Sequence, residues 1–273
     1  MIKDITIGQY YPQDSIIHRL DPRIKIISTF LYVLVLFICD GVFEYALVTL
    51  FLAALIKTSR IPVRFILKGL KPVMMILIFT IMVKVLFSGG MMVEEESILF
   101  KKGILCISTE GIRQGVFLGI RFVYLVIGTS MLTYTTTPNS LTTGLESVMK
   151  PLKIFKVPVA EAAMILTIAL RFIPILVEEA DRIMKAQMSR GADFEEGNVV
   201  KRVKSMAVIL IPLFVSAFRR ANDLAAAMEA RCYHGGEGRT RLKPLKMKGT
   251  DYGAMVTICL FVAVLITVHI KVG

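Results

Sequence analysis

Long apolar stretches constrain this chain more than any other feature of its sequence. Apolar residues make up 55% of its 273 residues, and the mean hydropathy is +0.67. Several stretches approach the roughly 20 residues that cross a bilayer as a helix. Lipid satisfies no backbone hydrogen bonds, and these stretches lack the alternation of barrel strands, so the spans should be helical. We therefore predict an all-α, polytopic membrane protein with about five transmembrane helices and further long helices at or under the membrane surface.

Five segments have the length and composition of spans. They are Arg23 to Cys39, Val42 to Ile56, Leu70 to Phe87, Gly115 to Tyr134 and Tyr252 to Ile270. Only Asp40 and Gly41 separate the first two, and this pair is a turn signal. The first two spans should therefore form a tight helical hairpin.

Charge in the loops predicts the orientation. The segment from Lys57 to Lys71 has five basic residues and no acid, whereas Ser88 to Gly111 has four acids and two bases. The positive-inside rule puts the first loop, and hence the N-terminus, in the cytoplasm. Residues 135–251 then return to the cytoplasm with 18 bases and 12 acids. Attraction to anionic membrane lipid accounts for the net charge of +12, so no nucleic acid partner is expected.

Two further apolar segments leave the number of spans open. Pro158 to Val177 and Val203 to Phe218 could be spans, which would make seven helices and place Arg190 outside. However, prolines interrupt both segments, and Arg171 lies deep in the first, where insertion costs roughly 2.5 to 3.5 kcal/mol. We interpret both as long surface helices packed against other helices of the chain.

Two short segments 41 residues apart repeat one pattern. Each ends with an arginine beside a small residue, and each carries small or apolar residues at three-residue spacing that permit close packing. These residues are Ala180, Ile183 and Ala186 before Arg190-Gly191, and Ala221, Leu224 and Ala227 before Arg231-Cys232. An arginine in the last turn followed by glycine can simply cap a helix. Because the pattern occurs twice, we also predict that both ends contact a partner protein.

Nothing in the sequence predicts catalysis. The four cysteines and three histidines have no metal-ligand spacing, and no phosphate loop or nucleophile motif is present. The spans also lack the paired acids expected of a proton-driven carrier. We expect no cofactor and no metal, and we interpret Arg121 as part of a structural ion pair or as a residue that reaches the surface.

Four motifs, in order along nearly the whole chain, resemble one known family. They are His18-Arg19-Leu20-Asp21-Pro22-Arg23-Ile24-Lys25, Leu170-Arg171-Phe172-Ile173-Pro174 with Glu178-Glu179-Ala180, Ser189-Arg190-Gly191, and Ala226-Ala227-Met228-Glu229-Ala230-Arg231. Together they are similar to the transmembrane T component of energy-coupling factor transporters, the EcfT/CbiQ/BioN family.

The resemblance implies a role in transport without catalysis by this chain. In that family, the T component joins two cytoplasmic ATPases of the ATP-binding-cassette type to a membrane protein that binds the substrate, the S component, for prokaryotic uptake of vitamins or metal ions. Paired Ala-Arg-Gly motifs at the ends of cytoplasmic coupling helices dock into grooves on the ATPases. The matching positions here are Ser189-Arg190-Gly191 and Ala230-Arg231-Cys232. Ser189 replaces the usual alanine and Cys232 the usual glycine, and a cap that needs positive φ would be less comfortable at Cys232.

The resulting domain prediction has three parts in a multi-pass protein of the prokaryotic cell membrane. Residues 1–134 form a membrane domain of four spans, 135–251 a cytoplasmic coupling-helix domain, and 252–273 a C-terminal transmembrane helix. The alternatives are a stand-alone secondary transporter, an intramembrane enzyme, or a membrane scaffold without transport. The identity of the substrate stays open, because in that family it belongs to the S component.

Overall fold

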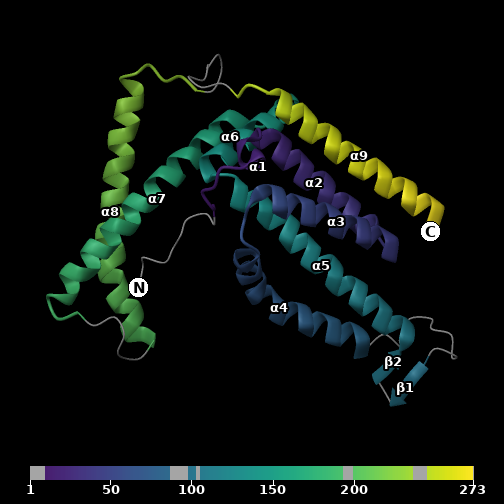
Figure 1. Ribbon diagram of the computed structural model, residues 1–273. Helices are drawn as coiled ribbons and strands as arrows, with labels where there is room; N and C mark the ends of the chain where they lie inside the picture. The colour runs from purple at the N-terminus through teal and green to yellow at the C-terminus, as the bar shows by residue number, and fades with distance from the viewer. Residues whose placement is uncertain (1–9, 87–97, 103–104, 193–198, 236–244, 273) are drawn as a thin grey trace. The chain divides into compact units, whose positions relative to one another are not determined.

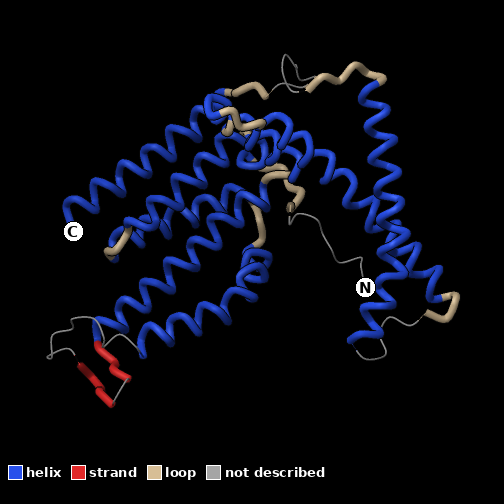
Figure 2. Tube along the Cα trace, turned by 180° about the vertical axis from the view of Figure 1, so that it is seen from behind, coloured by secondary structure: helices blue, strands red, loops and turns tan. Residues whose placement is uncertain are grey.

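The computed structural model describes residues 10–86, 98–102, 105–192, 199–235 and 245–272. In chain order the elements are α1 (Ile16–Arg19), α2 (Pro22–Ile38), α3 (Val42–Ser59), α4 (Val63–Leu86), β1 (Ile98–Lys102), β2 (Leu105–Ser108), α5 (Thr109–Thr135), α6 (Pro138–Val148), η3 (Lys150–Phe155), α7 (Val159–Met188), α8 (Val199–Glu229) and α9 (Gly249–Val272). The all-α prediction is confirmed, with one small addition: β1 and β2 pair antiparallel between α4 and α5 (Figure 2). Of the predicted external loop, Ser88 to Gly111, residues 88–97 and 103–104 lie outside the described residues.

Six described helices are long and apolar enough to cross a membrane by length and composition. They include α3, α4, α5 and α9, which coincide with four of the five predicted spans. The fifth predicted span, α2, has 17 residues, and the predicted turn at Asp40 and Gly41 lies between it and α3. The two helices share one hydrophobic core, which includes Leu36 and Val48. The other two of the six are α7 and α8, the segments for which the sequence left the alternative open.

The structure corrects one expectation about the prolines. Pro174 and Pro212 were expected to interrupt their segments, but α7 and α8 run through them without a break. Pro72 likewise lies inside α4, which begins at Val63 rather than at Leu70. A proline removes one backbone donor from the helix, while the remaining hydrogen bonds of a long helix hold the turns on either side.

The chain forms two compact units. One contains α7 and α8 with η3, and the other contains α1 to α5, most of α6, and α9. In the second unit α2, α3, α5 and α9 run side by side, with α4 along α5 (Figure 1). Its main core is drawn from α2, α3 and α9, including Tyr32, Leu36, Val48 and Leu265.

Small residues allow α4 and α5 to approach closely. A Cβ atom at Gly119 would lie 2.6 Å from Ile81 Cδ1, and one at Gly115 would lie 2.9 Å from Val85 Cγ2. The two glycines are four residues apart and therefore lie on the same face of α5. This Gly-x-x-x-Gly spacing is the close-packing pattern of membrane helices.

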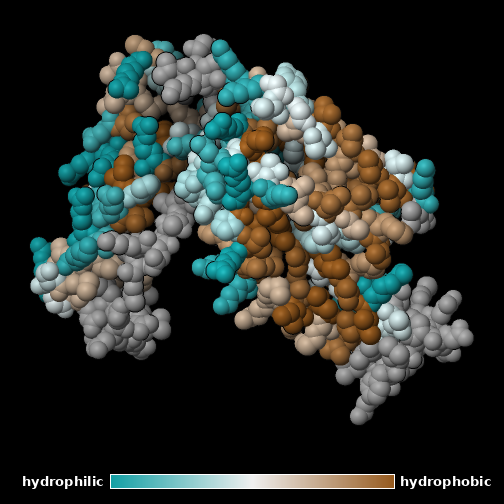
Figure 3. All heavy atoms as spheres, viewed as in Figure 1, coloured by the Kyte–Doolittle hydropathy of each residue, from teal (hydrophilic) through white to brown (hydrophobic). Residues whose placement is uncertain are grey.

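Apolar side chains cover the flanks of the second unit, whereas polar ones gather around α1 and the start of α4 (Figure 3). On α4 the exposed apolar residues include Met75, Ile76 and Phe79, which are 62 to 80% exposed. Such a surface is costly in water, so it is the face that meets lipid or another apolar partner.

Buried polar groups fix the end of the second unit that carries α1. Asp21 caps α2 by accepting a hydrogen bond from the Arg23 N–H at 2.9 Å. The buried Asp251 at the start of α9 accepts from the Asp21 N–H at 2.8 Å. Lys25 donates to the carbonyl oxygens of Thr135 at 2.9 Å and His18 at 3.2 Å. The motif around Asp21 thus joins α1, α2, α5 and α9.

Candidate partner-docking site

The first predicted docking motif ends α7 in a tight cap. Gly191 has a φ of +83°, and the N–H of Ala192 donates to Gln187 O at 3.0 Å. The N–H of Gly191 donates to Met188 O at 3.0 Å. This pair of hydrogen bonds defines a Schellman motif, in which the residue after the helix adopts a left-handed conformation. Arg190 is the last residue before that left-handed turn.

The second motif ends α8 with the same geometry. Cys232 has a φ of +55°, and the N–H of Tyr233 donates to Met228 O at 3.1 Å. The N–H of Cys232 donates to Glu229 O at 2.9 Å. A cap of positive φ therefore does fall at Cys232, which carries a side chain where glycine would be more comfortable.

The two caps correspond residue by residue. The N–H groups of Ser189, Arg190, Gly191 and Ala192 donate to Lys185, Gln187, Met188 and Gln187, and those 41 positions later make the same four bonds. Ser189, Arg190 and Gly191 are exposed, as are Ala230, Arg231 and Cys232. Neither guanidinium has an ion pair or hydrogen bond among the described residues. Each helix therefore ends with an arginine that is free to bind something outside the chain.

A polar clasp joins α7 and α8 where they cross (Figure 1). Glu179 accepts from the Ser216 hydroxyl at 2.6 Å and from Arg220 Nη2 at 2.7 Å. Glu179 and Arg220 are themselves 41 positions apart, so they occupy equivalent places in the two repeats. From the clasp to each docking arginine the chain runs 11 residues, or about 16 Å along a helix. We call residues 179–190 and 220–231 the two arms, and they are equal in length.

Next to the clasp, α7 and α8 form a groove of about 270 Å³. Its lining is apolar except for Arg220 of the clasp. Ala217, Ala221 and Leu224 of α8 face Phe172 and Leu176 of α7 across it. Of the three residues predicted as a packing stripe on α8, Ala221 and Leu224 line this groove and Ala227 does not; Ala221 and Ala227 are both exposed. Few residues of these helices are buried: Val159 and Ala163 in α7, and none in the described side chains of α8.

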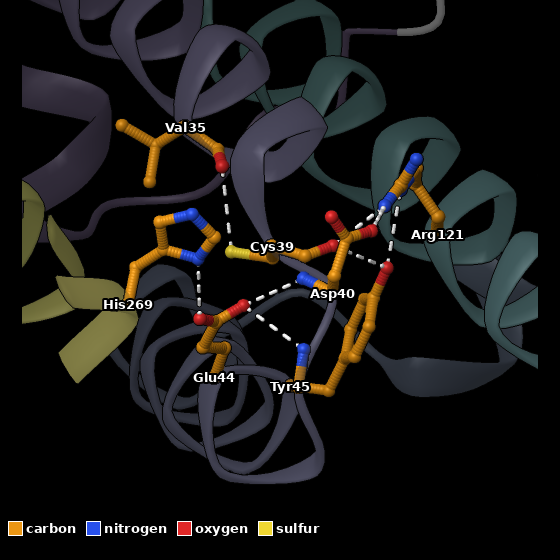
Figure 4. Close-up of polar contacts among 8 residues, drawn as sticks. Val35, Cys39, Asp40, Glu44, Tyr45, Arg121 and His269 are labelled. Atoms are coloured by element: carbon orange, nitrogen blue, oxygen red, sulfur yellow. Dashed lines mark hydrogen bonds and ion pairs between the residues drawn. The ribbon is translucent and has the colours of Figure 1, made fainter. Parts of the chain in front are cut away.

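Arg121 belongs to a separate polar cluster of the second unit (Figure 4). Its Nη2 lies 2.7 Å from Asp40 Oδ1 and donates to Cys39 O, while its Nε donates to Tyr45 Oη at 3.1 Å. Nearby, Glu44 accepts from the Asp40 N–H at 2.6 Å and pairs with His269 Nδ1 at 2.9 Å.

These bonds close the hairpin turn against α5 and α9. The interpretation of Arg121 as part of a structural ion pair is confirmed. The polar side chains of this cluster bind one another, so we assign them a structural role in holding the helices together.

Sequence reasoning quoted Glu179 within a motif without giving it a role, and it missed Arg220. The signal was available, because the 41-residue offset that relates the two arginines also relates these two opposite charges. No group of three or more His, Cys, Asp or Glu side chains that could hold a metal occurs among the described residues.

Apolar helices long enough to cross a bilayer define a multi-pass membrane protein, in which two helices end in matched arginine caps. Comparison with known proteins assigns its family. Residues 13–242 match the family model CbiQ, described as a cobalt transport protein.

Several relatives named "Energy-coupling factor transporter transmembrane protein EcfT" align over nearly their whole length. The protein of Ruminiclostridium cellulolyticum is 50% identical over 94% of this chain and 93% of its own. The protein of Bacillus subtilis is 46% identical over 97% of this chain and 98% of its own. That of Lactococcus lactis subsp. cremoris is 42% identical, with coverage of 97% and 98%. The chain belongs to the EcfT/CbiQ family of transmembrane components of energy-coupling factor transporters.

Proposed function

We propose that this chain is the coupling subunit of an importer driven by ATP. In this proposal it joins two ATPases of the ATP-binding-cassette type to a substrate-binding S component for uptake of a vitamin or metal ion. The observation that carries the proposal is the pair of matched caps, each with an exposed arginine that has no partner among the described residues. Two ends with the same backbone geometry suit a pair of similar ATPase subunits, one for each arginine.

Arginine suits such a contact on chemical grounds. Its guanidinium presents five donors in a rigid fork that engages carboxylates and carbonyl oxygens in two places at once. At the end of a helix the left-handed turn stops the backbone, so the side chain at that end can enter a partner's groove without the helix following it.

The proposed mechanism is mechanical. Closure of the two ATPases on binding ATP moves Arg190 and Arg231 relative to one another. The arms transmit this displacement because the Glu179 clasp holds α7 and α8 where they cross. The movement passes to the S component and tips it between orientations. In this mechanism the chain hydrolyses nothing itself, and residues Ser189, Arg190, Gly191, Ala230, Arg231 and Cys232 form the docking site.

The test is co-purification of the ATPases through a tag on this chain. We compare the wild type with the double variant Arg190→Glu, Arg231→Glu, which reverses both charges. Wild type should retain both ATPases and the double variant should lose them, while both remain inserted in the membrane. Arg182→Glu, Arg219→Glu serves as the matched control, because it also reverses two charges, at exposed residues of α7 and α8 away from the caps. Arg182 makes an exposed pair with Glu178 at 3.9 Å.

Equal retention by wild type and the double variant would remove the arginines from the docking interface. Substrate uptake into vesicles by this chain alone would instead favour a secondary transporter. Normal uptake in cells that lack the chain would leave only a scaffold role. Loss of the ATPases from the control variant as well would mean that general charge, rather than the two caps, holds the complex together.

A further inference from the structure

A basic pocket lies in the second unit, between α1 and the C-terminal end of α3. Its volume is about 480 Å³, and it opens beside the first predicted loop of the chain. The lining residues are Asp14, Ser15, Ile16, Arg19, Lys57, Thr58 and Arg60. None of them belongs to the docking site or to the cluster around Arg121.

Three cations and one acid line this pocket. Arg19 is 3.4 Å from Asp14, but both side chains are largely exposed, so water screens the pair. Lys57 and Arg60 have no ion-pair partner among the described residues. The pocket therefore carries an excess of positive charge that this chain does not neutralise.

Helix capping explains only part of this arrangement. Lys57 lies in the last turn of α3, and Arg60 is its C-cap residue with a φ of 58°. Cations there favour the negative end of the helix dipole, whatever else they do. Arg19, however, comes from α1, nearly forty positions earlier in the chain, and faces the same cavity. Convergence of two elements on a cavity is the feature that capping leaves unexplained.

Apolar residues adjoin the cations. Ile16 in the pocket wall is 64% exposed, and Val63 and Leu67 at the start of α4 are each 57% exposed. Farther along α4 lie more exposed apolar residues, among them Met75 and Phe79. A free phosphate ion would not contact these apolar residues, whereas a phospholipid carries an apolar chain next to its charged phosphate. A basic pocket at the end of a membrane helix such as α3 suits an anionic lipid headgroup.

We propose that this pocket binds the headgroup phosphate of an anionic glycerophospholipid, held by Arg19, Lys57 and Arg60. The guanidinium groups of Arg19 and Arg60 suit the phosphate oxygens, and the Lys57 ammonium adds a further donor. The lipid chains then lie against the exposed apolar residues of α4. A bound lipid would fasten α1 to α3 at the end of the unit where the buried Asp21 and Lys25 already hold the helices.

The experiment measures lipid binding to the purified full chain in detergent. Phosphatidylglycerol, phosphatidylcholine and inorganic phosphate are titrated separately, with bound lipid counted by native mass spectrometry and protection followed by thermal unfolding. The pocket variant is Arg19→Gln, Lys57→Gln, Arg60→Gln. The matched control is Arg64→Gln, Lys68→Gln, Lys71→Gln, which removes the same charge from exposed residues of the same basic segment outside the pocket.

We expect wild type and the control to bind phosphatidylglycerol in preference to phosphatidylcholine, and the pocket variant to bind it at least about tenfold more weakly. Inorganic phosphate should protect little. Equal weakening in both triple variants would overturn the proposal in favour of a diffuse surface charge. Protection by inorganic phosphate equal to that by the lipid would overturn it in favour of a soluble anion. The unfolding temperature in phosphatidylcholine shows whether the variants are folded, and ATPase co-purification, which depends on Arg190 and Arg231, is a separate readout.

Discussion

Cys232 carries a conformational cost that its counterpart Gly191 avoids. A residue with a Cβ in the left-handed region is about 1 kcal/mol less stable than glycine. Cys232 adopts a φ of +55° because the cap at the end of α8 requires it. Its side chain is exposed, so burial does not offset the strain. Gly191 in the equivalent cap at the end of α7 has no Cβ, so its positive φ causes no such strain.

We therefore predict that Cys232→Gly stabilises the chain by about 0.5 to 1 kcal/mol, and that Gly191→Ala destabilises it by a similar amount. Thermal and denaturant unfolding of the purified chain measure both changes. Gly249→Ala is the control, because that position has open space but no positive φ. A destabilising Cys232→Gly would mean that the thiol makes a contact that the backbone geometry does not explain.

His18 makes the α1 end of the second unit sensitive to acid. Its Nε2 donates to Tyr11 O at 3.0 Å, and its Nδ1 lies 2.7 Å from the Ser15 hydroxyl. Burial is the main cause that lowers the pKa of His18 below its ordinary 6.5, and the nearby Lys25 charge acts in the same direction. The hydrogen bond to Tyr11 O and the Asp14 carboxylate act against this shift.

Because the folded pKa is the lower one, the unfolded chain binds the proton more readily. Stability from His18 is complete above pH 6.5 and declines as the pH falls from there toward the folded pKa. We predict that His18→Gln makes the unfolding temperature less dependent on pH in this window. His234→Gln, at an exposed histidine, should leave the dependence as it is. An unchanged slope in His18→Gln would assign the acid sensitivity to other groups.

At the scale of elements, the clasp between α7 and α8 is the contact most open to test. Single reversals, Glu179→Arg or Arg220→Glu, place like charges opposite each other at the crossing point. We predict that each lowers transport several-fold without loss of the protein from the membrane. The double reversal restores the opposite charges and should recover most of the activity.

Ser216 limits that recovery, because its hydroxyl donates a hydrogen bond to Glu179 and an arginine at position 179 has no acceptor for that bond. Transport in cells and protein level in the membrane are measured together for the four proteins. If the double reversal were as defective as the two singles combined, the clasp would act through something other than charge pairing.

The elements themselves were largely predictable from the sequence. Hydrophobic length gave α3, α4, α5 and α9, because the bilayer sets a minimum length and lipid demands internal hydrogen bonds. The Asp40-Gly41 turn and both arginine ends were also readable, since turn and cap chemistry is local. The prediction that Pro174 and Pro212 interrupt their segments was wrong, because the effect of a proline depends on the hydrogen bonds of the whole helix around it.

Hydrogen bonds between residues far apart in the chain could not be predicted from the sequence. The approach of Lys25 to Thr135 O, and of Asp251 to the Asp21 N–H, depends on packing between segments more than a hundred positions apart. The pairing of Glu179 with Arg220 was the exception, because the repeat offset marks both residues. The strained conformation of Cys232 could be considered from the sequence because the motif of the resembling family has glycine at that position.

For the whole molecule, the decisive question is on which side of the membrane the two docking ends lie. Helices α7 and α8 are apolar and long enough to span, yet the coupling mechanism requires Arg190 and Arg231 to meet ATPases in the same compartment. Surface helices would satisfy this requirement, whereas two spans would put the arginines on opposite sides. The exposed thiol of Cys232 offers a natural probe beside one arginine.

We predict that a membrane-impermeant maleimide labels Cys232 in inverted vesicles and leaves it unlabelled in right-side-out vesicles, with Cys232→Ser as the blank for the other cysteines. In the Cys232→Ser background, Ser189→Cys places the probe beside Arg190 and should give the same pattern, because Ser189 is also exposed. Labelling of the two positions from opposite sides would establish that α8, which lies between them, spans the membrane. It would also end the coupling mechanism, since one arginine would then be out of reach of ATP-driven subunits.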